Sequence, residues 1–195
     1  RNGAFSGRRY HAKQRRVMEG RDYSVTEPTH IAGLKWVSAE PFRDERGLNM
    51  LLWNEAEFVR ATGLFELTFV EDSVSTSHAG VLRGVHIEPK AWRLVTCLAG
   101  HAFLAVVDYR NWSPTYLEHA VFGLRPAPLR QLMVPPMFGL GALALEGGTI
   151  LHYKWTVPCD PARQLTYRYD DPRFGIAWPL DGITPILSAR DRVAR

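Results

Sequence analysis

Short runs of apolar residues alternate with polar and turn residues along the chain from about residue 31. The runs favour β-branched and aromatic residues, a pattern typical of β-sandwiches and barrels. Glycines in two short connections, Ala99-Gly100-His101 and Gly147-Gly148, predict tight hairpins. We expect strands at residues 31–38, 65–76, 81–88, 92–99, 101–109, 116–124, 130–134, 138–146, 149–157 and 175–178. The pattern therefore predicts a single all-β domain over residues 31–195.

One clear helix signal interrupts this pattern at residues 54–62. Asn54 can cap the first turn, Glu55 and Glu57 lie near the positive end of the helix dipole, and Gly63 can end the helix. We therefore expect one or two short helices beside the strands.

Charge is distributed unevenly along the sequence. The 195 residues carry a net charge of +4, but residues 1–22 hold seven Lys and Arg against two acidic residues. The rest of the chain is close to neutral, so we expect no basic face for nucleic acid. Residues 1–30 are predicted to form a basic, mobile tail, because the leading segment is polar and lacks periodicity.

The composition is that of a domain that folds without metal or disulfides. Hydrophobic residues make up 46% of the chain, enough to bury a core. No apolar run approaches the ~18 residues of a membrane span. Cys97 and Cys159 are too few for a disulfide framework and are expected to be free thiols. These features predict a cytoplasmic protein with no membrane contact.

The segment from Val81 to Glu88 carries the first candidate chemistry. On a strand, strict alternation places Gly84, His86 and Glu88 on one face and Arg83 on the other. Glycine inside a strand often marks a bulge, and a bulge at Gly84 brings Arg83 and His86 to the same side. A histidine and an arginine that face a sandwich interior indicate a polar pocket.

Motifs across residues 33–191 closely resemble the dTDP-4-dehydrorhamnose 3,5-epimerase family, in the same order and at similar spacing. The motifs are Asp44-Glu45-Arg46-Gly47, Val81 to Glu88, Arg93-Leu94-Val95, Val107-Asp108-Tyr109-Arg110, Ser113-Pro114-Thr115, Arg130-Gln131-Leu132, Tyr153-Lys154, Gly175-Ile176-Ala177-Trp178-Pro179 and Leu187-Ser188-Ala189-Arg190-Asp191. The resemblance implies a cupin-type double-stranded β-helix, also called a jelly roll. It also implies a homodimer that exchanges strands, and an isomerase that needs neither metal nor cofactor.

The same resemblance implies the roles of individual residues. His86 matches the general base that removes a proton next to a ketone, Asp191 matches its aspartate partner, and Tyr153 matches the proton donor. A neutral imidazole is a competent base near pH 7, and a carboxylate on its other nitrogen fixes the tautomer. Arg83 and Arg93 are expected to stabilise the enolate.

Several positions depart from the family pattern, and we expect them in the substrate pocket. Leu140 stands where the family has histidine, Leu48-Asn49 replaces an aromatic pair, and Pro158-Cys159 replaces a tyrosine pair. Glu71 and Glu88 stand where the family has uncharged polar residues. Their negative charges suggest a pocket less suited to a pyrophosphate. The predicted substrate-binding residues are Arg83, Arg93, Arg46, Glu71, Ser73, Glu88, Leu140 and Trp155.

Four functions remain open from the sequence. The first is a 3- and/or 5-epimerase of a small molecule, a dTDP-4-keto-6-deoxysugar. The second is a family member recruited to a non-nucleotide substrate, such as a natural-product cyclase or isomerase with a more apolar pocket. The third is a catalytically inactive binding cupin. The fourth is a metal cupin, which we do not favour because the His-x-His ligand pair is missing around His86.

Overall fold

The computed structural model describes residues 23–194, which divide into two compact units. The smaller unit includes residues 38–66 and the start of the described chain, and the larger one includes residues 26–37 and 67–194. The strands of the larger unit are β2 (Lys35–Ala39), β5 (Glu71–Ser77), β6 (Leu82–Glu88), β7 (Arg93–Ala99), β8 (Ala102–Asp108), β9 (His119–Leu124), β10 (Gln131–Val134), β11 (Phe138–Ala144), β12 (Thr149–Trp155) and β13 (Leu165–Thr166). Only residues 35–37 of β2 belong to this unit. A four-residue helix, α3 (Ala189–Arg192), follows them.

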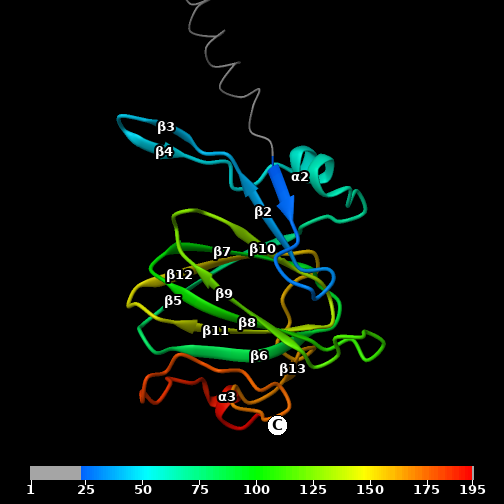
Figure 1. Ribbon diagram of the computed structural model, residues 1–195, viewed down its shortest axis with the longest axis vertical. Coiled ribbons are helices and arrows are strands. Elements are labelled where there is room, and N and C mark those ends of the chain that lie inside the picture. The colour runs from blue at the N-terminus through cyan, green and yellow to red at the C-terminus, as the bar shows by residue number, and fades with distance from the viewer. Residues whose placement is uncertain (1–22, 195) are drawn as a thin grey trace, which may run out of the picture. The chain divides into compact units, whose positions relative to one another are not determined.

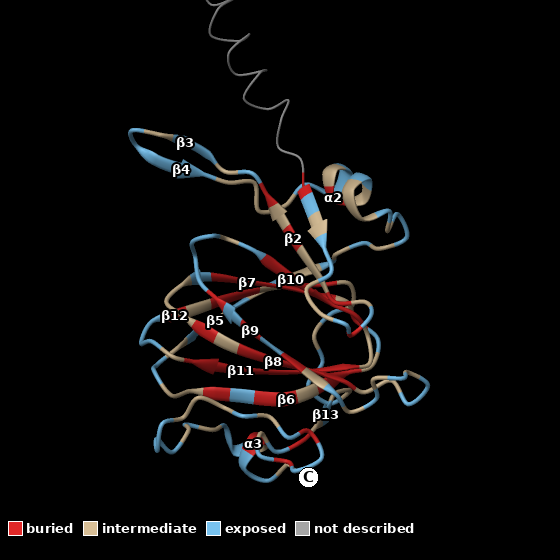
Figure 2. Ribbon diagram, viewed as in Figure 1, coloured by how far each residue is buried: buried red, intermediate tan, exposed pale blue. Residues whose placement is uncertain are grey.

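The larger unit is a sandwich of two sheets (Figure 1). One sheet has the strand order β2-β10-β7-β12-β5 and the other β13-β6-β11-β8-β9, with antiparallel pairing throughout both. Apolar side chains from β7, β8, β9, β10, β11 and β12 form one core between the sheets. Figure 2 shows this burial concentrated on the central strands. The predicted all-β sandwich is therefore confirmed.

The two predicted hairpins are wrong, although the glycine turns are present. β7 belongs to one sheet and β8 to the other, and the same holds for β11 and β12. Each turn therefore carries the chain across the sandwich, as in a jelly roll. Gly100 has φ 73°, and a Cβ there would lie 2.5 Å from Thr149 Oγ1, so the two crossing turns lie against each other.

Most predicted strands overlap observed ones, although the strand predicted at residues 65–76 begins six residues before β5. The exception is residues 175–178, which form no strand. β13, only two residues long, was not predicted, and neither were the short strands at residues 23–26, 42–44 and 47–49. Trp178, inside the failed prediction, instead donates its indole N–H to the carbonyl of Tyr169 at 2.7 Å and packs against the outer face of the second sheet.

The smaller unit contains most of β1 (Tyr23–Thr26), the hairpin of β3 (Phe42–Asp44) with β4 (Gly47–Asn49), and α2 (Glu55–Thr62). α2 forms as predicted: the Asn54 side chain accepts from Glu57 N, and Gly63 ends the helix at φ 71°. Five of the six hairpin residues are exposed.

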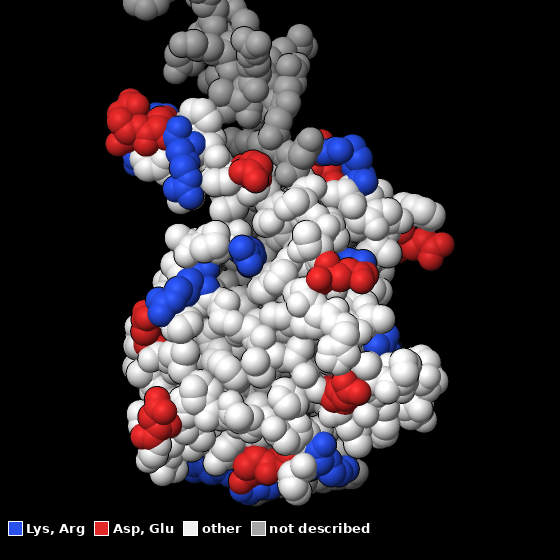
Figure 3. Space-filling view, in the orientation of Figure 1, with Lys and Arg blue, Asp and Glu red and all other residues white. Residues whose placement is uncertain are grey.

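The predicted tail lies mainly outside the described residues. Residues 23–30 are described, and β1 falls among them; the boundary at residue 30 stays a prediction. On the face in Figure 3, Lys and Arg lie scattered and mostly close to Asp and Glu. Within residues 23–194, no helix is long and apolar enough to cross a membrane.

Candidate active site

The bulge predicted at Gly84 is present in β6. Residue pairing with β11 runs from His86 opposite Leu140 to Arg83 opposite Ala142, so β6 holds one extra residue between these pairs. Gly84 has φ 110°, and a Cβ there would lie 2.4 Å from the carbonyl oxygen of Leu140. Only glycine fits this position, and the bulge lets Arg83 and His86 line one cavity.

His86 is hydrogen-bonded to Asp191 on α3, with His86 Nε2 2.7 Å from Asp191 Oδ1. Ser188 caps α3: its hydroxyl accepts from Asp191 N at 3.1 Å and donates to Asp191 Oδ2 at 2.8 Å. Burial favours a raised pKa for this carboxyl group. The hydrogen bond and charge of His86, together with Ser188 and the Gly84 amide, outweigh burial, and the pKa of Asp191 is lowered.

This pairing determines which nitrogen of His86 can act as a base. With a lowered pKa, Asp191 is ionised near pH 7, and an ionised carboxylate only accepts hydrogen bonds. Nε2 of a neutral His86 must therefore carry the hydrogen. Nδ1 keeps its lone pair and has no hydrogen-bond partner among the described residues, so it is available to a ligand.

Tyr153 reaches the same cavity from the opposite sheet. The cavity has a volume of about 380 Å³ and lies between β6 and β11 on one side and β5 and β12 on the other. Burial raises the pKa of the Tyr153 phenol, and the positive charges of Arg83 and Arg93 only partly oppose this. The phenol is therefore protonated at neutral pH and can donate a proton.

Arg93 is a buried cation in the cavity wall. Its side chain is fully enclosed, donates from one terminal nitrogen to the carbonyl of Phe138 at 2.7 Å, and leaves Nε without a partner. The guanidinium carbon lies 6.0 Å from the ring centre of Trp155. Desolvation lowers the pKa of Arg93 to about 10, so the group is still charged at pH 7 and can stabilise an anion in the cavity.

The structure gathers eight predicted site residues around this cavity and leaves three elsewhere. The eight are His86, Asp191, Tyr153, Arg83, Arg93, Ser73, Leu140 and Trp155. Ser73 accepts a hydrogen bond from the Trp155 indole at 3.0 Å, which fixes that ring. Arg46 belongs to the smaller unit, on the turn between β3 and β4, and pairs there with Asp44.

Glu71 and Glu88 do not line the cavity, so neither carboxylate faces a ligand there directly. Glu88 is fully buried, accepts from the amides of Lys90 and Ala91, and is paired with Arg163 at 3.1 Å. These partners hold its pKa below the usual range despite burial. The carboxylate of Glu71 accepts from the Cys159 amide.

Sequence reasoning missed several cavity residues. These are Val74, Ser75, Ala142, Pro161, Gln164, Ser188 and Arg190, whereas Cys159 lines the cavity as expected from its departure from the family pattern. Ser75 could have been found, because alternation on β5 places it on the same face as Ser73. Gln164 lies in an irregular segment and Arg190 on the four-residue helix α3, and neither has a periodic pattern long enough to reveal the facing direction. Arg190 adds a third arginine to the cavity beside Arg83 and Arg93.

Metal ligands are not clustered in the described part of the chain. Among residues 23–194, no group of three or more His, Cys, Asp and Glu is placed to hold an ion. The cavity that His86 lines contains three arginines, one tyrosine and a single carboxylate, Asp191. Positive charges suit an anionic ligand, and a histidine with a tyrosine suits proton transfer.

Comparisons with known proteins agree with this geometry. Residues 28–195 match the family model of dTDP-4-dehydrorhamnose 3,5-epimerase. A protein of that name from Methanothermobacter thermautotrophicus is 38% identical over 167 residues, covering 84% of this chain and 89% of the relative. The crystal structure of dTDP-6-deoxy-D-glucose-3,5-epimerase RmlC from Legionella pneumophila, in complex with dTDP-4-keto-L-rhamnose, has a TM-score of 0.82 at 32% identity, and the match covers 88% of this chain and 91% of that one.

A third similar protein differs in activity. ChmJ, a 3'-monoepimerase from Streptomyces bikiniensis in complex with dTDP-quinovose, has a TM-score of 0.79 at 28% identity, covering 87% of this chain and 86% of that one. These similarities confirm the predicted cupin-type fold and favour an epimerase over a recruited cyclase. The chain belongs to the dTDP-4-dehydrorhamnose 3,5-epimerase family.

Proposed function

We propose that this protein epimerises a dTDP-4-keto-6-deoxysugar at C3, C5 or both, by moving a proton next to the C4 ketone. Family membership supports this proposal, as do the activities named for the similar proteins. The observation that carries it is the placement of His86 on one sheet and Tyr153 on the facing sheet, around one cavity. A planar enolate between them has its two faces turned to different proton-transfer groups.

In the proposed reaction, His86 Nδ1 takes the proton from the carbon next to the ketone. The electron pair of the broken C–H bond moves into the enolate, whose oxygen becomes negative. Arg93 and Arg83 stabilise that charge, and Asp191 stabilises the imidazolium that forms. Tyr153 then protonates the opposite face of the carbon. Solvent returns a proton to Tyr153 and accepts one from His86, so the enzyme is unchanged after turnover.

Deuterium exchange tests this function. The purified protein is incubated with dTDP-4-keto-6-deoxyglucose in deuterated water, and the product is followed by NMR. Deuterium at C3, C5 or both, with inverted configuration, is the expected result, and the position tells one-carbon from two-carbon epimerisation. The absence of deuterium at both carbons would exclude the proposed function.

We also propose that the protein is a homodimer that exchanges strands and works in the cytoplasm. The β3–β4 hairpin supports the dimer, because a two-stranded hairpin with nearly all residues exposed is marginally stable by itself. Two free thiols, Cys97 and Cys159, support a reducing compartment. Light scattering during gel filtration is expected to give twice the chain mass; the mass of one chain would exclude the dimer.

A further inference from the structure

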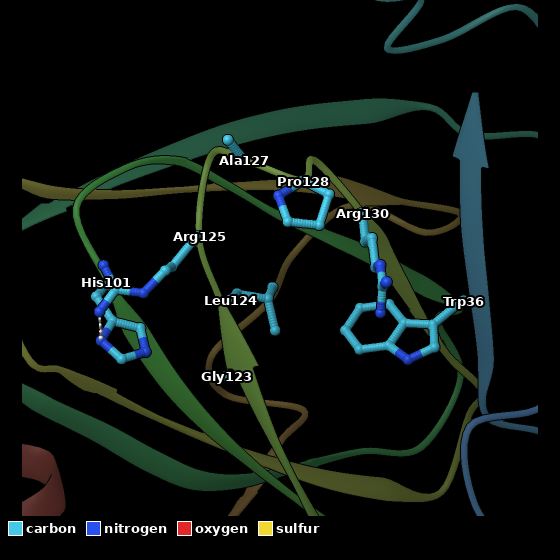
Figure 4. Close-up of a pocket in the computed structure, with 8 residues that line it drawn as sticks. All are labelled: Trp36, His101, Gly123, Leu124, Arg125, Ala127, Pro128 and Arg130. Atoms are coloured by element: carbon cyan, nitrogen blue, oxygen red, sulfur yellow. Dashed lines mark hydrogen bonds between the residues drawn. The ribbon is translucent and has the colours of Figure 1, made fainter. Parts of the chain in front are cut away.

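A second cavity opens at a different part of the larger unit, and it shares no lining residue with the candidate active site. It has a volume of about 340 Å³ and lies between the end of β9, the loop of residues 125–130 and β2 (Figure 4). Its lining residues are Trp36, His101, Gly123, Leu124, Arg125, Ala127, Pro128 and Arg130.

One side of the cavity is an arginine–histidine pair. A terminal nitrogen of Arg125 lies 2.8 Å from His101 Nδ1. A guanidinium only donates, so Nδ1 accepts, and the hydrogen of the neutral imidazole is on Nε2. Burial and the charge of Arg125 lower the pKa of His101, in agreement with a neutral ring at pH 7. Nε2 is therefore a hydrogen-bond donor, and it lies beside Gly123.

The other side of the cavity is an arginine on a tryptophan. The guanidinium carbon of Arg130 lies 5.9 Å from the ring centre of Trp36. Trp36 is held in turn by Phe122, which meets it edge to face at 5.4 Å. Among residues 23–194, Arg130 has no ion-pair or hydrogen-bond partner, so its N–H groups are free to bind a ligand. Figure 4 shows Arg130 with Trp36 on one side of the cavity and Arg125 with His101 on the other.

Every polar side-chain group that lines the cavity can donate a hydrogen bond, and no carboxylate is among the lining residues described. Glu146, outside the lining, pairs with Arg125 at 3.1 Å, and both side chains are about half exposed. That pair offsets one positive charge only weakly through water, and Arg130 has no ion-pair partner among residues 23–194. The cavity therefore suits a negatively charged ligand.

We propose that this cavity is a second binding site, and that its ligand is the phosphate group of a small molecule. A phosphate dianion has enough acceptor oxygens for donors on two sides, whereas a carboxylate has a single negative charge and two oxygens. Ala127 and Pro128, both exposed, leave an apolar surface for the organic part of the ligand. The proposal does not depend on the epimerase activity, because it uses other residues.

Inorganic phosphate is the probe, and backbone amide shifts of the isotope-labelled full chain are the readout. The Gly123 amide reports this cavity, and the His86 amide reports the candidate active site. Saturable shifts of Gly123 in the millimolar range are expected. Arg130→Gln and Arg125→Gln should each weaken this binding about tenfold, since each removes a charge-assisted contact. Both side chains are exposed, so the variants are expected to fold.

Two matched controls separate this site from others. Arg83→Gln, in the candidate active site, should leave the Gly123 titration unchanged, as should Arg168→Gln on an exposed ion pair elsewhere. A Gly123 titration that survives both cavity variants, or no saturable shift of Gly123, would overturn the site. Equal affinity for acetate would overturn the assignment to phosphate.

Discussion

Nε2 of His86 lies 2.7 Å from Oδ1 of Asp191, although 105 positions separate the two residues. His86 is on a sheet strand, and Asp191 is on a four-residue helix that lies beside that strand (Figure 1). The catalytic base we propose is therefore complete only when the segment after residue 180 is folded onto β6.

Asp191→Asn should lower kcat by about 10²- to 10⁴-fold, because the amide neither stabilises an imidazolium nor fixes the tautomer that leaves Nδ1 free. KM should change little, since Asp191 itself is nearly inaccessible to substrate. Steady-state kinetics measure both values. Ser188→Ala is the control: it leaves the carboxylate and should cost far less activity. A variant Asp191→Asn with normal kcat would remove the carboxylate from the mechanism.

Arg93→Met should lower kcat by about 10²- to 10³-fold, because it removes a buried positive charge from the enolate site. Arg93→Lys, which keeps a charge, should retain much more activity. Thermal unfolding of both variants tests whether the chain still folds. Equal kcat values for Met and Lys at this position would show that the charge has no role.

Gly84→Ala should destabilise the fold by about 2–4 kcal/mol, because alanine tolerates neither the positive φ nor the 2.4 Å approach to Leu140 O. Gly147→Ala is the matched control, since the nearest atom to its added Cβ would be 4.0 Å away. It should change stability by less than about 0.5 kcal/mol. Urea unfolding measures both. Equal stabilities would contradict the need for glycine in the bulge.

Asp108→Asn should destabilise the protein by about 3–5 kcal/mol near pH 7, because it breaks a buried pair with Arg110. Burial alone raises the pKa of Asp108, but Arg110, Ser113 and Thr115 lower it overall. A lowered folded-state pKa stabilises the fold fully above the unfolded value of about 3.9 and less as pH falls through the folded value.

The stability difference between wild type and Asp108→Asn should therefore be constant above about pH 5 and shrink only below about pH 4. Asp170→Asn, at the half-exposed pair with Arg168, is the control and should cost less than about 1 kcal/mol. Urea unfolding at a series of pH values gives both. A difference that already shrinks between pH 7 and 5 would contradict the lowered pKa.

The sequence predicted the sandwich and the bulge because both follow from local rules. Alternation marks strands, and glycine inside a strand marks irregular pairing, as at Gly84. The two hairpin predictions were wrong for a different reason. Gly100 and Gly147-Gly148 correctly predict turns, but a turn does not determine whether the next strand pairs with the last one or crosses to the opposite sheet.

In the candidate site too, local patterns predict some features and not others. Alternation placed Glu88 on the face of His86, yet its carboxylate binds the amides of the following turn and Arg163, contacts that no periodicity reveals. The pairing of His86 with Asp191 was predicted through family resemblance, because no local pattern links residues so far apart. Arg190 and Gln164 were missed because they lie outside regular strands.

The most direct test of the proposed mechanism compares wild type, His86→Ala and Tyr153→Phe in deuterated water with dTDP-4-keto-6-deoxyglucose. Tyr153→Phe should still exchange the proton next to the ketone, because His86 can remove it and return deuterium to the same face. It should invert the carbon far more slowly than wild type. His86→Ala should lose both exchange and inversion. Inversion at the wild-type rate in Tyr153→Phe, or exchange at the wild-type rate in His86→Ala, would contradict the two-sided proton transfer.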